Sequence, residues 1–140
     1  MKKILVPCDG SENALRAVRH AASLAKMVPG VQLELLNVQD PVLLREHAAA
    51  TIQEIERWQS DEANRIFQPA KQILDADGIS YQVARRTGSP AREIVHHLAD
   101  THCDAIVMGT RGLSAIAGLM IGSVATKVIH LVDVPVTLIK

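Results

Sequence analysis

The stretch from Ile106 to Ala125, IVMGTRGLSAIAGLMIGSVA, decides the fold of this chain. A short apolar run, Ala105 to Met108, stops at Gly109, and a segment that can continue as a helix follows Gly122. A strand, a glycine-bearing loop and a helix start, in that order, are typical of α/β proteins that hold phosphate. The stretch therefore predicts an α/β fold with an anion site at the loop.

Each part of the stretch has a physical reason to attract an anion. Glycine lets the backbone approach an anion closely and adopt positive φ without a Cβ clash. The first turn of a helix carries unpaired N–H groups and a partial positive charge, and the Ser123 hydroxyl could cap this helix or donate to a phosphate. The alternative is a turn, a loop and a cap with no ligand. Neither a Walker loop nor a G-x-G-x-x-G strand end occurs, so the residues alone predict an anion or nucleotide-phosphate site and go no further.

Composition excludes several classes of function. The 140 residues fit one domain, residues 1–140, and no run approaches the eighteen apolar residues of a membrane span. Fifteen basic and fifteen acidic residues leave no net charge, and aromatic residues make up 2%, so we expect neither nucleic-acid nor membrane binding. The two cysteines, Cys8 and Cys103, are expected at opposite ends of parallel strands, too far apart for a disulfide. Reduced thiols and a start without an export signal favour the cytoplasm.

Strand and helix patterns alternate along the chain. Strands are predicted over residues 4–6, 31–38, 79–84, 105–108 and 136–139. Helices are predicted after the caps Ser11 and Ser89, over residues 63–74, and from Gly122 or Ser123 onward. Pro69 should kink or split its helix, while the helix-favouring segment from Val42 to Ser60 has no clear start. Strands alternating with helices imply a parallel sheet between helix layers, with the alternating strand 79–84 at an edge.

A resemblance joins these motifs. The spacing Gly109-x2-Gly112-x9-Gly122-Ser123 resembles the nucleotide-binding signature G-x2-G-x9-G-[ST] of the universal stress protein family. The opening KKILVPCDGSENALRAV (Lys2 to Val18) resembles the first strand and acidic loop of that family. Gly88-Ser89-Pro90-Ala91 with Ile94 resembles the approach to its third helix, and Val134-Pro135-Val136 resembles its last strand. The resemblance covers nearly the whole chain.

The resemblance implies a fold and a ligand. The fold is a single-domain, Rossmann-like open parallel sheet of the adenine nucleotide alpha hydrolase-like type, with five strands in the order 3-2-1-4-5. That order places a crevice between the first and fourth strands, where strand order reverses. The implied ligand is ATP, with Mg²⁺ or Mn²⁺. The nucleotide-binding residues it implies are Pro7, Cys8, Asp9, Val38, Met108, Gly109, Arg111, Gly112, Gly122, Ser123, Val124 and Ala125.

Two positions depart from the family pattern. Cys8 stands where Thr or Val is common, and Ala125 stands where Ser or Thr is common, so two possible hydroxyls are absent. Losing one neutral hydrogen bond costs about 0.5–1.5 kcal/mol, which weakens phosphate binding without abolishing it. Arg111 and Lys127 could supply compensating charge. Asp9 taken alone is also explained by ordinary turn chemistry before glycine.

The resulting hypothesis is a cytoplasmic ATP-binding stress-response module whose surface is read by partners. No catalytic residue is predicted, because the loop lacks a clear general base, an arginine finger or a carboxylate pair, so hydrolysis should be slow at best. The alternatives are a slow ATPase or self-phosphorylating enzyme, with Ser123 as acceptor, and an interaction protein with an empty crevice. The resemblance also implies a homodimer through the strand Val134 to Ile139, whose apolar edge would otherwise invite pairing.

The remaining reactive side chains receive structural interpretations. His96, His97 and His102 lie near Cys103, but their spacing does not suit a metal site, and we expect surface histidines on the last turn of a helix. A redox or nucleophilic role for Cys8 is likewise not favoured, because no basic partner can be assigned from the sequence. No metal site is predicted.

Overall fold

The computed structural model describes residues 1–41, 45–112 and 121–140, and within them the chain forms one five-stranded parallel sheet. The sheet order is β3-β2-β1-β4-β5, which confirms the predicted fold class and strand order. The strands are β1 (Lys3–Pro7), β2 (Gln32–Gln39), β3 (Tyr81–Thr87), β4 (Ala105–Gly109) and β5 (Val136–Ile139). The described helices are α1 (Glu12–Met27), α3 (Ile52–Ala76), α4 (Pro90–Thr101) and α5 (Ser123–Leu131).

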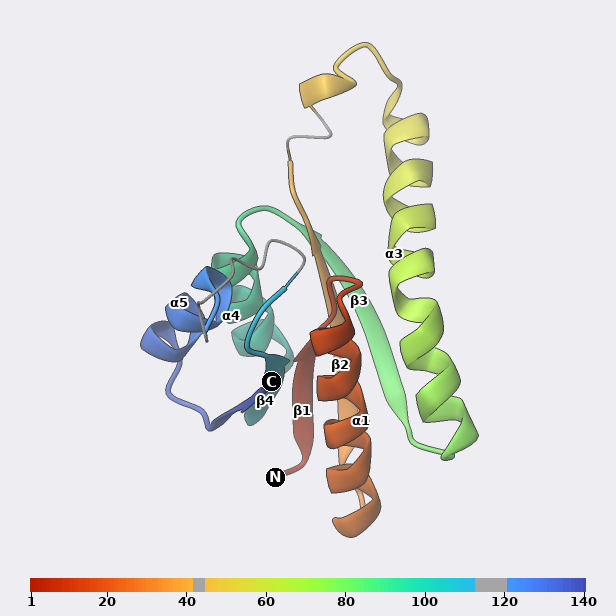
Figure 1. Ribbon diagram of the computed structural model, residues 1–140. Helices are drawn as coiled ribbons and strands as arrows, with labels where there is room; N and C mark the ends of the chain where they lie inside the picture. Colours follow the sequence, from red (N-terminus) through yellow and green to blue (C-terminus); the bar gives the residue numbers. More distant parts are fainter. Residues whose placement is uncertain (42–44, 113–120) are drawn as a thin grey trace.

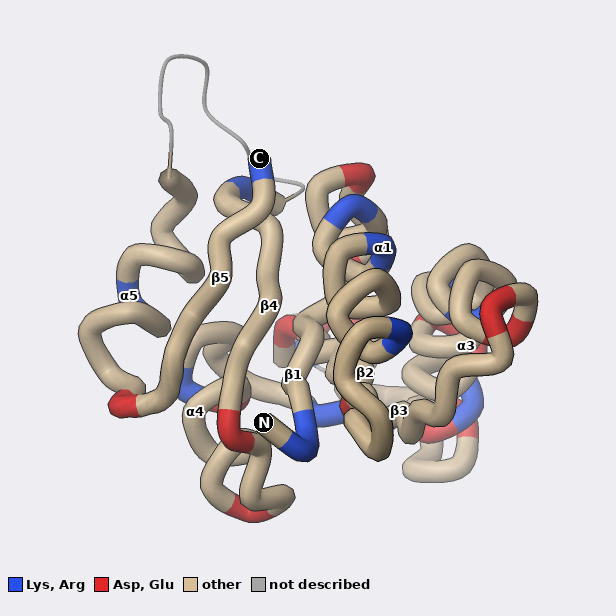
Figure 2. The backbone as a smooth tube through the Cα atoms, turned by 90° about the horizontal axis from the view of Figure 1, so that it is seen from below, with Lys and Arg blue, Asp and Glu red and all other residues tan. Residues whose placement is uncertain are grey.

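Helices cover both faces of the sheet, as the alternating pattern predicted (Figures 1 and 2). One core packs α1 and α3 against the sheet, and the other packs α4 and α5 against the opposite face. Alternate residues of β2 serve the two cores: Leu33 and Leu35 belong to the first, and Leu36 belongs to the second. Strands buried on both faces explain why Ile4, Leu5 and Val6 form a continuous apolar run.

Helix α1 begins where its cap was predicted. The Ser11 hydroxyl accepts a hydrogen bond from the Ala14 N–H at 3.1 Å, and Glu12 lies in the first turn, where its charge complements the helix dipole. The small residues Ala17 and Ala21 are fully buried, so the helix lies close against the sheet. This packing fixes the first turn of α1 beneath the end of β4.

Helix α3 shows where the helix begins, which the sequence left open, and how the helix accommodates Pro69. It begins at Ile52 with a capping box, in which Thr51 and Glu54 satisfy each other's backbone N–H groups. It continues through Pro69 as one helix, so the predicted split is wrong. Pro69 lies on the exposed side of the helix while the neighbouring Phe67 and Ala70 stay buried, and this packing holds the helix together. Residues 42–44 of the helix-favouring segment lie outside the described residues.

Helix α4 begins at the predicted cap, but it differs from the predictions in the hydrogen bonding of Ser89 and in the burial of His97. Ser89 occupies the N-cap position and Pro90 the first turn, but the Ser89 side chain makes no capping hydrogen bond. His97, expected at the surface, is 6% exposed and contacts the buried Glu34 carboxylate through Nε2 at 2.8 Å. Arg86 lies near the other ring nitrogen, at 3.4 Å, so charged partners on β2 and β3 explain the burial.

The two edges of the sheet are β3 and β5. The partly exposed side chains of β3 agree with its predicted edge position. Among the described residues, no helix is long and apolar enough to cross a membrane.

Leu35→Ala should lower the free energy of unfolding by about 2–5 kcal/mol, because the side chain is 0% exposed and its removal leaves a cavity between the sheet and α3. Its register partner Val83 is 41% exposed, so Val83→Ala is the matched control and should cost less than about 1 kcal/mol. Urea denaturation with an unchanged slope measures both values. Equal losses would contradict the assignment of the core to this face.

Candidate functional site

A crevice opens between β1 and β4 because the two strands pair over a short distance. Their register contains Ile4 opposite Ala105 and Leu5 opposite Ile106, after which the strands diverge. β1 then stays with β2, and β4 stays with β5 as far as Gly109. In open parallel sheets ligands bind beyond the strand ends at such a reversal of strand order.

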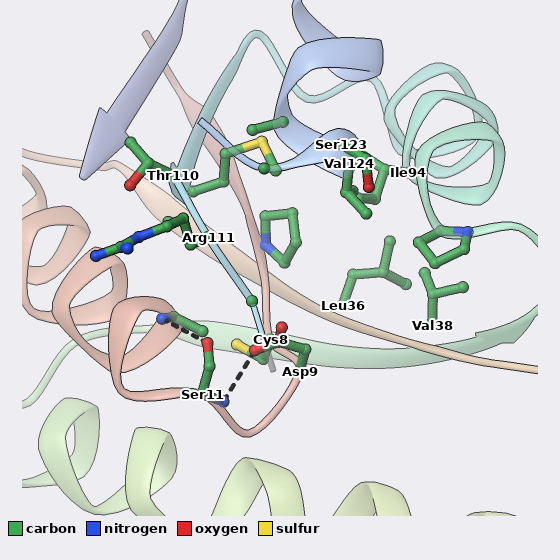
Figure 3. A pocket seen from close by; sticks show the side chains of 18 of the residues that line it. Cys8, Asp9, Ser11, Leu36, Val38, Ile94, Thr110, Arg111, Ser123 and Val124 are labelled. Carbon is green, nitrogen blue, oxygen red and sulfur yellow. Dashed lines mark hydrogen bonds between the residues drawn. The ribbon is translucent and has the colours of Figure 1, made fainter. Parts of the chain in front are cut away.

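A pocket of about 420 Å³ fills this crevice (Figure 3). All twelve residues predicted to bind a nucleotide line it, from Pro7 on one strand to Ala125 on α5. The lining residues that sequence reasoning missed are Ser11, Ala14, Leu36, Asp40, Pro90, Ile94 and Thr110. The structure therefore brings the predicted residues together, while their role in binding stays a prediction.

One side of the pocket is apolar and the other is rich in backbone. Leu36 and Val38 of β2 lie near Ile94 of α4 on the apolar side (Figure 3), and Pro90 of α4 also lines the pocket. The sequence pattern could have indicated these four residues. Leu36 and Val38 lie two apart, on one face of a strand, and Pro90 and Ile94 lie four apart, on one face of a helix. This side suits a flat apolar ring.

The glycines of the loop are needed for close approach. A Cβ on Gly109 would lie 2.9 Å from Asn13 Cβ, and a Cβ on Gly122 would lie 3.1 Å from the Thr110 carbonyl oxygen. A Cβ on Gly112 would overlap the Asp9 carboxylate. Positive φ occurs at other glycines of the described chain, such as Gly10, so the expected left-handed role of the loop glycines is wrong.

The N-terminus of α5 lines the pocket, and the N–H groups of its first turn have no partner within the helix. Gly122 is the N-cap, and its N–H donates a hydrogen bond to the Thr110 carbonyl oxygen at 2.5 Å. The first helical hydrogen bond runs from the Thr126 N–H to the Gly122 carbonyl oxygen. The N–H groups of Ser123, Val124 and Ala125 therefore precede the helical ladder. The Ser123 side chain does not cap this helix, because it lies one residue inside it. The arrangement can hold an anion.

Asp9 has two roles in the structure. Its Oδ1 accepts a hydrogen bond from the Ser11 N–H at 2.9 Å, which is the turn chemistry expected for Asp before glycine. Its other oxygen lies toward Gly112 across the crevice. The residue thus fixes the loop after β1 and also presents a carboxylate to the pocket.

The Cys8 thiol is buried and unreactive as a nucleophile at neutral pH. Burial, and secondly the Asp9 charge, raise the pKa of its thiol from 9.0 to about 12. The thiol stays protonated at neutral pH and donates to the Val6 carbonyl at 3.5 Å, whereas a nucleophilic cysteine needs a thiolate. Cys103 is also buried and free, with its pKa raised mainly by burial. Neither thiol has the lowered pKa that is typical of a nucleophilic cysteine.

Metal-ligating side chains do not gather in the described part of the chain. There, no group of three or more His, Cys, Asp or Glu side chains could hold a metal ion. His97 contacts Glu34 and Arg86, and His96 lies on the exposed side of α4. Arg111 is the basic side chain that lines the pocket, whereas the exposed Lys127 lies outside the lining.

Comparisons with known proteins agree with this geometry. The model of the universal stress protein family matches residues 1–140. Universal stress protein MJ0531 of Methanocaldococcus jannaschii is 30% identical over 139 residues, covering 99% of this chain and 82% of the relative. The solved structure of MJ0577 from the same organism has a TM-score of 0.86 at 29% identity, covering 99% of this chain and 95% of that one.

A second solved structure carries a nucleotide. The universal stress protein of Archaeoglobus fulgidus in complex with dAMP has a TM-score of 0.70 at 25% identity, covering 100% of this chain and 98% of that one. That protein binds dAMP; its likeness to the present chain extends over the whole fold.

The raised pKa of Cys8 predicts a specific loss of stability at high pH. The folded pKa lies above the unfolded value of 9.0, so the contribution is complete below pH 9 and is lost as pH rises toward 12. Between pH 8 and 10 the native protein should lose about 1 kcal/mol more unfolding free energy than Cys8→Ala, which cannot titrate there. Urea denaturation at each pH measures this difference. Parallel curves for the two proteins would show that the thiol pKa is not raised.

Proposed function

The chain belongs to the universal stress protein family, and we propose that it binds ATP in the crevice between β1 and β4. One observation carries this proposal: Gly109, Gly112 and the first turn of α5 line the same pocket as the apolar side formed by β2 and α4. A nucleotide needs both environments, one for its base and one for its phosphates. The dAMP complex of a relative supports the assignment to an adenine nucleotide.

The lining residues indicate which end of the nucleotide lies where in the pocket. The adenosine lies among Pro7, Cys8, Asp9 and Val38, beside the apolar side chains of β2 and α4. The phosphates lie toward Gly109, Gly112 and the first turn of α5, where backbone N–H groups donate and the helix dipole is favourable. Mg²⁺ or Mn²⁺ enters with the triphosphate, whose oxygens supply the hard donors these ions accept, because the described residues contain no group of three or more side chains that could hold a metal.

The module acts by occupancy, and turnover is slow. Phosphoryl transfer requires a positioned nucleophile and concentrated positive charge, but the described lining contains Arg111 as its basic side chain and no histidine or lysine. Asp9 already accepts a hydrogen bond from the Ser11 N–H. Bound ATP therefore biases a stress-response surface that partners read.

A homodimer through residues 134–139 is part of the same proposal. β5 is the last strand of the sheet order, so one of its edges pairs with no other strand of the described chain. Val134, Val136 and Leu138 pack partly against the core, while Thr137 is exposed on this strand. An edge of this kind is suited to pairing with a second copy.

Ser123→Glu should weaken ATP binding at least tenfold. An acidic residue in the first turn of α5 suits the helix dipole, so the fold is retained, but its charge repels the phosphates. Ser23→Glu introduces the same charge on an exposed position of α1, outside the lining, and should leave binding unchanged. In a thermal-shift titration with Mg-ATP, the native protein should gain about 2.7 kcal/mol at a hundred times Kd.

Two results of this titration would contradict the proposal. A native protein that shows no shift does not bind ATP, which favours an interaction protein with an empty crevice. Equal shifts in the native protein and in Ser123→Glu place the nucleotide elsewhere. Steady ADP release by the native protein would favour the slow ATPase instead.

Thr137→Lys should convert a dimer into a monomer, because a charge on an edge strand opposes pairing. Light scattering should give about twice the 15.2 kDa chain mass for the native protein and the chain mass for the variant. Thr126→Lys, on the exposed side of α5, is the control and should stay dimeric. A dimeric Thr137→Lys would place the interface on another surface.

A further inference from the structure

A buried amide side chain holds the loop at the base of the pocket. Asn37 is 2% exposed, and its Nδ2 donates a hydrogen bond to the Cys8 carbonyl oxygen at 3.0 Å. Asn37 itself does not line the pocket, whereas Cys8 and Asp9 do. A side chain outside the pocket therefore determines the position of backbone inside it.

The contact lies where β1 leaves the sheet. The Cys8 N–H donates to the Leu36 carbonyl at 2.7 Å, which continues the β1–β2 ladder by one step past Pro7. The Cys8 carbonyl is then taken by the Asn37 side chain. A side-chain bond can satisfy this buried carbonyl while the main chain turns away toward Asp9 and Gly10.

The direction of this bond sets the direction of the next N–H group. Cys8 C=O and Asp9 N–H belong to one planar trans peptide, so they point in opposite directions. Asn37 holds the carbonyl, and thereby turns the Asp9 N–H away from itself at the base of the crevice. That N–H is a main-chain donor of a residue that lines the pocket.

A chain of amides fixes which way Asn37 faces. Gln39 Nε2 donates to Asn37 Oδ1 at 3.1 Å and to the Gln59 carbonyl at 2.8 Å. Gln59 Nε2 in turn donates to the Thr87 hydroxyl at 3.0 Å. Because the Asn37 oxygen is occupied by Gln39, its nitrogen must face Cys8, and a flipped amide would set two acceptors against each other. The orientation of Asn37 is thus held from α3 and β3.

We propose that Asn37 is a positioning residue for nucleotide binding, which directs the Asp9 N–H toward the base or ribose of the ligand. The proposal rests on the proposed function, since it assigns a role in the same pocket. It predicts that affinity depends on a donor at position 37 even though that side chain does not touch the nucleotide. The amide chain makes α3 part of the support of the site.

The test separates positioning from stability with three variants. Asn37→Leu keeps a similar shape but removes the donor, Asn37→His restores an N–H at the Nδ1 position, and Gln39→Met breaks the outer link while leaving the bond to Cys8. Calorimetric titration with Mg-ATP should show affinity reduced at least tenfold for Asn37→Leu, largely restored for Asn37→His, and reduced by a smaller factor for Gln39→Met, which keeps the Asn37 donor but removes the bond that orients it. Urea denaturation records how much stability each variant loses.

A second measurement needs no ligand. Amide hydrogen exchange of the segment from Pro7 to Ser11 should be faster in Asn37→Leu than in Gln39→Met, when conditions give the two variants the same free energy of unfolding. Equal exchange in the two variants, or an Asn37→Leu affinity equal to that of Gln39→Met, would overturn the positioning role. A native protein that does not bind ATP overturns the proposed function, and in that case the exchange comparison still decides whether Asn37 orders the loop.

Discussion

The short pairing of β1 with β4 is the constraint on which the site depends. Two register positions, at Ile4 and Leu5, hold these strands together before β1 turns off at Pro7 and β4 continues to Gly109. The resulting gap is bridged by loops rather than by a ladder, so backbone N–H groups near it are available to a ligand. A longer ladder between β1 and β4 would close the crevice and leave the glycine loop without a pocket to face.

The three glycines of the spacing lie where the chain after β4 makes its close contacts. Gly109 approaches the first turn of α1 at Asn13, whose side chain donates to the Ile139 carbonyl at 3.2 Å, so the end of β5 is held in the same place. Gly112 approaches Asp9, and Gly122 approaches the Thr110 carbonyl. The first two contacts join the loop to α1 and to the end of β1, and the third joins the two ends of the loop to each other, so each of the three glycines meets a different close contact.

Features that depend on residues close together in the sequence could be predicted, and features that depend on residues far apart in the sequence could not. Local patterns located the strands and the Ser11 cap, because these depend on neighbours in sequence, whereas the family resemblance named the twelve residues that line the pocket. The burial of His97 could not be predicted, because its partner Glu34 is 63 residues away. The continuation of α3 through Pro69 depends on packing against the sheet. The start of α3 was predictable in principle from the Thr51–Glu54 capping box, a local signal that was missed.

Strand β2 carries polar side chains on both faces, and each one ties the strand to a different helix. Glu34 reaches His97 of α4 on one face, while Gln39 reaches the Gln59 carbonyl of α3 on the other. Buried polar groups lower stability unless they are paired, so these residues specify which helix segment lies against which strand position. An apolar strand would permit either helix to slide along the sheet. Because Asn37 belongs to the same strand, the register that fixes α3 and α4 also fixes the carbonyl of Cys8, and the geometry of the pocket follows from the packing of the whole domain.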